Sequence, residues 1–103
     1  MKMYLASNES RLAYCPYGSC KVVHDDNGVH LISYSTHVCG IDSDGWLYCY
    51  GTFSRTTIKH IGAFMKEYAP VSPNGFKFNY YTAKDCYVNN YEYNLYTGEI
   101  RRV

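Results

Sequence analysis

Three runs rich in β-branched and aromatic residues follow one another closely in the first half of the chain. Such residues favour strands. The last two runs are separated by Asp42-Ser43-Asp44-Gly45, a cluster of turn formers short enough to close a hairpin. An earlier run, Lys21 to His24, leads into another turn signal, Asp25-Asp26-Asn27-Gly28. The pattern predicts an antiparallel meander whose strands cover Val29 to Tyr34, Thr36 to Asp42 and Trp46 to Tyr50.

The next segment has helical rather than strand periodicity. Ser54 is well placed as an N-cap, and Pro70 prevents continuation of a helix. The pattern therefore predicts an amphipathic helix over about residues 55–68. Its apolar side chains recur at intervals of three and four residues, at Ile58, Ile61, Phe64, Met65 and Tyr68.

The last quarter of the chain predicts three further elements. Phe76 to Tyr81 has the composition of a strand, and Thr82-Ala83-Lys84-Asp85 is similar to a capping box that would open a short helix near residues 82–89. Thr97-Gly98 predicts the two-residue turn of a terminal hairpin. In that register Leu95 faces Ile100 and Tyr93 faces Arg102, with Glu92 near Arg101.

Together these elements predict a single α+β domain over residues 1–103, an antiparallel sheet of about four to six strands with one main helix on one face. Alternation gives the third predicted strand two different faces, one of which must pack against the helix. One carries Leu47 and Cys49, and the other carries Trp46, Tyr48 and Tyr50, for which the N-terminal segment or the tail is a candidate cover.

Composition narrows the function. The net charge of +1 gives no long-range attraction to a phosphate backbone, and no apolar run approaches a membrane span or a signal peptide. We therefore expect a soluble, intracellular protein. The five cysteines are an odd number, which favours reduced thiols over a disulfide framework.

Thirteen tyrosines in 103 residues exceed what one small core can bury. Tyrosine gives large, stiff contact area and keeps a hydroxyl for a partner, so an excess favours recognition. We expect the tail to form an exposed patch that binds a partner protein, with arginines at its rim. The expected contact residues are Tyr80, Tyr81, Tyr87, Tyr91, Tyr93, Tyr96, Arg101 and Arg102.

The segment Ser33 to Val38, the pair Ile41-Asp42 with Gly45, and the block Tyr50 to Phe64 carry a resemblance to known proteins. The block has Ser54, then two threonines, His60-Ile61 and Phe64 at fixed spacing. It resembles a family of small proteins of unknown function from phages and mobile elements of Gram-positive bacteria. The resemblance implies no enzymatic activity. It implies a setting in which short single-domain proteins bind a host enzyme and block it.

The start of the predicted helix has two interpretations. As an anion or nucleic-acid site, its first-turn amides and hydroxyls would bind phosphate beside basic side chains. The residues of that face are Ser54, Arg55, Lys59, His60 and Lys66. Alternatively, Ser54 caps the helix, Thr57 bonds locally beneath the sheet and His60 supports a strand end. We favour the second interpretation because capping alone accounts for these residue types.

Cys15, Cys20, His24 and His30 lie close together in sequence and raise the question of a metal site. Their spacing matches no standard zinc module, so we expect no metal and no other cofactor. No spacing favours a cysteine or histidine nucleophile either, and we expect no enzyme.

The resemblance, together with the small size, the tyrosine excess and the missing catalytic signature, therefore implies an inhibitor in the cytoplasm of a bacterial host cell. Its expected target is a host protein, above all a bacterial defence nuclease such as a CRISPR effector. The alternative is a regulatory protein that binds nucleic acid through Arg55, Lys59 and Lys66.

Overall fold

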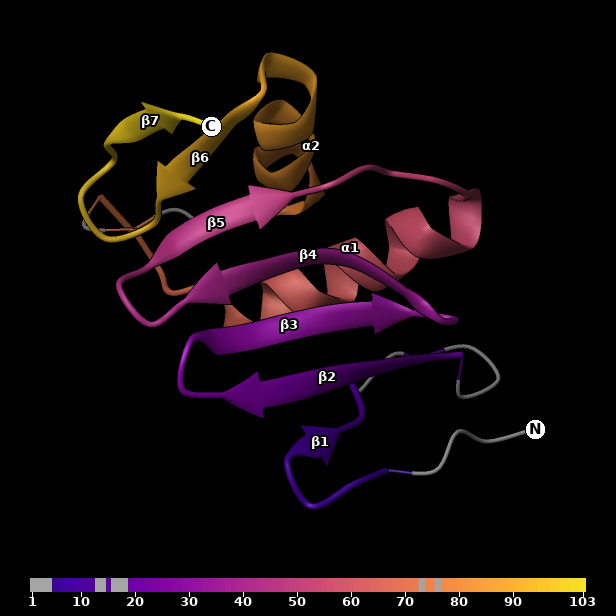
Figure 1. Ribbon diagram of the computed structural model, residues 1–103. Helices are drawn as coiled ribbons and strands as arrows, with labels where there is room; N and C mark the ends of the chain where they lie inside the picture. The colour runs from indigo at the N-terminus through magenta and orange to yellow at the C-terminus, as the bar shows by residue number, and fades with distance from the viewer. Residues whose placement is uncertain (1–4, 13–14, 16–18, 73, 76) are drawn as a thin grey trace.

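The computed structural model describes residues 5–12, 15, 19–72, 74–75 and 77–103. There the chain forms one antiparallel sheet of seven strands in sequence order, with both helices on one face (Figure 1). The helices are α1 (Arg55–Tyr68) and α2 (Tyr80–Asn89). The strands are β1 (Glu9–Ser10), β2 (Cys20–Asp25), β3 (Gly28–Ser33), β4 (Thr36–Asp42), β5 (Trp46–Cys49), β6 (Tyr91–Asn94) and β7 (Ile100–Arg102).

The α+β class is confirmed, with one strand more than the expected four to six. The unexpected strand is β1, whose two residues pair with Val22 and Val23 of β2 but are too few to carry a pattern. The meander and the main helix lie where the sequence predicts them. Tight turns join β2 to β3 and β3 to β4, and the pairing of β3 with β4 is offset by a bulge after Leu31.

The core lies between the sheet and the two helices. Ile61, Phe64 and Met65 of α1 are fully buried in one cluster with Leu31 and Leu47 from the sheet. Burial of Leu47 decides which face of β5 meets the helices, and the aromatic face points the other way. Among the described residues, no helix is long and apolar enough to cross a membrane.

The segment before α2 differs from the prediction. The expected strand from Phe76 to Tyr81 is wrong over its described part. Tyr80 and Tyr81 begin α2, and Lys77 forms an isolated bridge with Val71. Phe76 itself lies outside the described residues. The capping box is formed by Asn79 at the N-cap and Thr82 three residues later, whereas the prediction has the box begin at Thr82. Asparagine is an equally good N-cap, and its side chain accepts from the Tyr81 N–H at 2.9 Å.

The terminal hairpin has a different register from the expected one. Ile100 pairs with Tyr93 rather than Leu95, and Arg102 pairs with Tyr91 rather than Tyr93. The expected neighbours Glu92 and Arg101 do pair, and Arg101 Nε donates to Glu92 Oε1 at 2.7 Å. Asn94 causes the shift. Its Oδ1 accepts the N–H groups of Tyr96 and Thr97 at 2.9 and 3.0 Å, which lengthens the turn.

Asn94 also ties this turn to the one before β5, because its Nδ2 donates to the Asp44 carbonyl at 3.2 Å. Replacing the buried Asn94 with alanine leaves that carbonyl and two backbone N–H groups without partners, so we expect a loss of about 1–3 kcal/mol in the free energy of unfolding. Urea unfolding measures it. Asn89→Ala is the matched control, since Asn89 is exposed and its side chain donates to the Asp85 carbonyl at the surface. Equal stability of both variants would contradict this role of Asn94.

Candidate functional site

The tail tyrosines divide between the core and the surface. Tyr80, Tyr91 and Tyr93 pack against the core cluster, whereas Tyr81, Tyr87 and Tyr96 are exposed. The exposed ones come from separate places, two from α2 and one from the β6–β7 turn. Arg102 lies over the Tyr91 ring, and its Nη1 donates to the Asn89 carbonyl at 2.7 Å. Arg101 points elsewhere, toward Trp46 on β5.

The serine and threonine cluster at the start of α1 has the structural role that we favour from the sequence. Ser54 Oγ accepts from the Thr57 N–H at 3.2 Å, and Thr57 Oγ1 lies 3.1 Å from Ser33 Oγ at the end of β3. His60 is fully buried, with Nδ1 2.8 Å from the same Ser33 hydroxyl. Arg55 and Lys59 are exposed on the other side of the helix. His60 therefore does not join the basic side chains.

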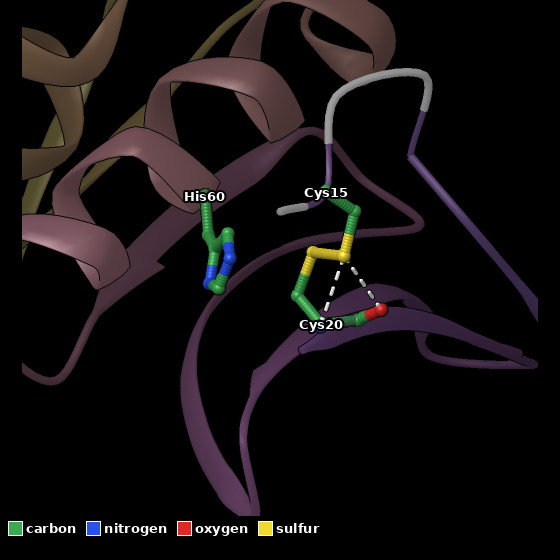
Figure 2. Close-up of side chains that lie close together, drawn as sticks. All are labelled: Cys15, Cys20 and His60. Carbon is green, nitrogen blue, oxygen red and sulfur yellow. Dashed lines mark hydrogen bonds between the residues drawn. A yellow bond between two sulfur atoms is a disulfide. The ribbon is translucent and has the colours of Figure 1, made fainter. Parts of the chain in front are cut away.

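The cysteines and histidines near the N-terminus are brought together only in part. Cys15 and Cys20 form a disulfide with Cα atoms 5.9 Å apart, so the expectation of reduced thiols is wrong for this pair. His24 faces α1, where its ring contacts Tyr68, while His30 faces away from the helices. The histidine beside the disulfide is His60 (Figure 2), a contact that sequence spacing cannot reveal.

The three other cysteines belong to the core. Burial raises the pKa of the Cys39 and Cys49 thiols, and it raises the pKa of Cys86 to about 12. Cys86 Sγ also lies 3.7 Å from the Leu47 carbonyl, to which it donates. A thiol held in this protonated form is a poor nucleophile. The strand cysteines are packing residues, as expected.

The sheet face away from the helices carries a group of polar and aromatic side chains that we call the open face. No described helix or strand lies over it (Figure 1). Alternation along paired strands brings these side chains to the same side. The open face consists of Asp25, His30, His37, Asp42, Trp46, Tyr48, Tyr50, Glu92 and Arg101, with Glu9 and Lys21 at the β1–β2 edge.

A continuous hydrogen-bond chain crosses the centre of the open face. The Tyr48 hydroxyl lies 2.5 Å from His30 Nδ1 and 2.6 Å from His37 Nε2. His30 Nε2 in turn lies 2.9 Å from Asp25 Oδ1. The sequence alone does not reveal this chain, because the chain depends on the register that sets Gly40 opposite both His30 and Tyr48.

The direction of this chain follows from the chemistry of its ends. An ionised Asp25 only accepts, so His30 donates from Nε2, and with His30 in its neutral form Nδ1 accepts the Tyr48 O–H. The Tyr48 oxygen then accepts from His37 Nε2–H. Burial lowers the pKa of His37, and the bond to His30 lowers the pKa of Asp25. These shifts favour the protonation states that the chain requires.

The Tyr48 ring packs directly over Gly40. A Cβ at this position would stand 2.3 Å from the Tyr48 hydroxyl oxygen and 2.8 Å from the Val29 carbonyl oxygen. Burial raises the pKa of Tyr48, so the phenol stays protonated. Its ring also lies 5.2 Å from that of Tyr50, which is 62% exposed. The arrangement presents fixed rings and hydrogen-bonding groups at an accessible surface, which suits recognition.

Arg101 continues the open face toward the terminal hairpin. Its guanidinium lies 4.0 Å from the centroid of the Trp46 ring and makes ion pairs with Glu92 at 2.7 Å and Asp42 at 3.7 Å. Arg101, from the tail, thus lies over the Trp46 ring. Tyr48 is half-buried among its neighbours, and Tyr50 is mostly exposed.

The chain was compared with known proteins. Residues 3–75 match a family of unknown function, DUF8033. The match includes the disulfide, α1 and the whole hydrogen-bond chain of the open face, and it ends before α2. Comparison with curated proteins and with solved structures finds no match.

Gly40→Ala tests the packing of Tyr48. Because the added methyl group meets the Val29 backbone as well as the phenol, we expect a loss of about 1–3 kcal/mol in the free energy of unfolding. Tyr48 should also lose its bonds to the histidines, which the shifted imidazole signals of His30 and His37 in NMR spectra would report. Gly62→Ala is the control, since a Cβ there meets only ordinary contact with Tyr80 at 4.0 Å. Unchanged imidazole signals in Gly40→Ala would contradict the account.

Stability should depend on pH through His37 and His60. Burial lowers the pKa of both below the ordinary value of 6.5, so the unfolded chain binds more protons than the folded one just below that pH. The free energy of unfolding is therefore expected to fall as the pH drops below 6.5, and to level off below the folded pKa values. Urea unfolding between about pH 8 and 5 measures it. His37→Gln should flatten the slope; an unchanged slope would contradict this assignment.

Proposed function

The chain belongs to the DUF8033 family, whose function is unknown, and we propose that it acts by binding another protein through the open face. The supporting observation is the Asp25–His30–Tyr48–His37 chain, which fixes an aromatic surface in place before any partner arrives. Pre-ordered rings lose little conformational entropy on binding, and this increases affinity. The exposed Tyr50 beside them is a suitable anchor.

The charges of the open face favour a protein over a nucleic acid. It carries four carboxylates, from Glu9, Asp25, Asp42 and Glu92, and their ion pairs use only two permanent cations, Lys21 and Arg101. A phosphate backbone would be repelled by this balance. Carboxylates next to phenol and indole rings instead suit arginine and lysine, which form both ion pairs and cation–π contacts. The partner surface that fits is therefore basic.

Enzymes that hold nucleic acid have such basic surfaces, including the positively charged channels of CRISPR effectors. We propose that the partner is a host defence nuclease of this kind and that the protein inhibits it by occupying the surface meant for nucleic acid. The resemblance to phage and mobile-element proteins supports this setting. The proposal requires no catalytic residue and no cofactor of the inhibitor itself.

The alternative function, nucleic-acid binding, rests on the outer side of α1. Arg55, Lys59 and Lys66 are all exposed there, and Lys77 adds a cation where its Nζ reaches the Lys66 carbonyl at 3.4 Å. Glu67, next to Lys66, reduces the charge of this side. Binding through this side would weaken steeply as salt rises, whereas a contact anchored by aromatic rings would change little.

A capture experiment tests the proposal. Tagged full-length protein is incubated with lysate of a bacterial host, and the captured protein is purified and assayed for nuclease activity with and without the inhibitor. We expect inhibition by the wild type and weakening of at least about 30-fold by Tyr50→Ala, which corresponds to ~2 kcal/mol at an anchor residue. Tyr81→Ala is the matched control, because Tyr81 is similarly exposed but lies on α2.

Two outcomes would contradict the proposal. One is a loss of inhibition in Tyr81→Ala while Tyr50→Ala inhibits as strongly as the wild type. The other is a shift of labelled DNA or RNA by the protein alone that disappears in Lys59→Ala, which would support the alternative on α1. Circular dichroism of each variant verifies that the fold is retained.

A further inference from the structure

A second group of functional side chains lies on the opposite side of the sheet from the open face. Cys15, Cys20 and His60 each place one donor atom within 4.8 Å of the other two (Figure 2). Cys20 and His60 are fully buried, and Cys15 is partly buried. The group joins three separate parts of the fold: the segment before β2, the first residue of β2 and the middle of α1.

These donors have the chemistry of a zinc site. Two thiolates and one imidazole are a common ligand set for Zn²⁺, and together they neutralise its double charge, which suits a buried position. Neutral imidazole is the form of histidine that binds metals, and His60 is fully buried beside the two sulfur atoms. The Cys20 N–H lies 2.9 Å from Cys15 Sγ and donates to it, which stabilises negative charge on that sulfur.

The surroundings also orient the imidazole for this role. With its proton on Nδ1, His60 donates to Ser33 Oγ at 2.8 Å, and Ser33 is held by Thr57 at 3.1 Å. The lone pair of Nε2 then points toward Ser19, whose Oγ lies 3.1 Å away and which directly precedes Cys20. Metal-binding histidines are fixed in the same way, by a hydrogen bond from the nitrogen that does not bind the metal.

We propose that Cys15, Cys20 and His60 bind a zinc ion when the disulfide is reduced. A dithiol reductant transfers two electrons and two protons to the disulfide and is itself oxidised to a disulfide, which leaves two free thiols. Zinc binding then releases the two thiol protons. Among the described residues, no further histidine, cysteine or carboxylate joins the group, so the fourth tetrahedral position is left for water. Oxidation and metal binding therefore exclude each other.

This site is independent of the open face, and its test does not use the partner. Full-length protein is reduced, freed of reductant without air, and titrated with cobalt(II), which reports thiolate bonds by a charge-transfer band and tetrahedral geometry by its visible bands. We expect one cobalt per chain, displaced by zinc, and no band in the oxidised protein. Cys15→Ser and Cys20→Ser should lose most of the charge-transfer band. Ser33→Ala should weaken zinc binding about 10–100-fold.

Two control variants change a thiol and a histidine that lie outside the proposed site. Cys49→Ser changes a partly buried thiol outside the group, and His24→Gln changes the histidine that sequence spacing suggests; both should retain the band. Because His60 is in the core, Cys15→Ser rather than a His60 variant is decisive, with its fold verified by circular dichroism. The proposal is overturned if the reduced, folded wild type gives no thiolate band, or if Cys15→Ser gives the full wild-type band.

Discussion

One-sided burial is the constraint on which the rest of this structure depends. The central strands direct their large apolar side chains, among them Leu31 and Leu47, toward α1 and α2, and no described element covers the other face. That face must therefore satisfy its own polar groups beside water. It does so by linking Asp25, His30, Tyr48 and His37 into one hydrogen-bond chain. The same arrangement that stabilises the uncovered face also fixes its side chains in place, which supports the proposal that a partner binds there.

Most of the fold could be predicted because its signals are local. Alternation in β3 to β5 and the spacing around Phe64 in α1 each extend over several residues, and Ser54 marks a helix start. The errors fall where one side chain decides between similar alternatives. Asn79 rather than Thr82 begins α2, and Asn94 lengthens the last turn by accepting two backbone N–H groups. Such choices depend on a few hydrogen bonds of about 1 kcal/mol each, which no periodic pattern records.

The candidate sites were less predictable, for a physical reason. Each combines residues that are distant in sequence, and the geometry of the open face follows from strand register. His24 and His30 look equivalent in the sequence, yet alternation sends one toward Tyr68 and the other toward Tyr48. Gly40 gave a signal that could have been used, since a glycine within a strand often marks close approach of another group. The local role of Ser54, Thr57 and His60 was predictable because capping needs only neighbouring residues.

Two groups of side chains thus lie on opposite sides of one sheet, the open face, which we propose binds a partner, and a buried group of sulfur and nitrogen donors. The central claim is that the first is where a partner binds. Aromatic NMR spectra of the protein, recorded as its captured partner is added, test this claim most directly. We expect the ring signals of Trp46, Tyr48 and Tyr50 to change when the partner binds, while those of Tyr81 and Tyr87 on α2 stay in place. Changes confined to the α2 rings would contradict it.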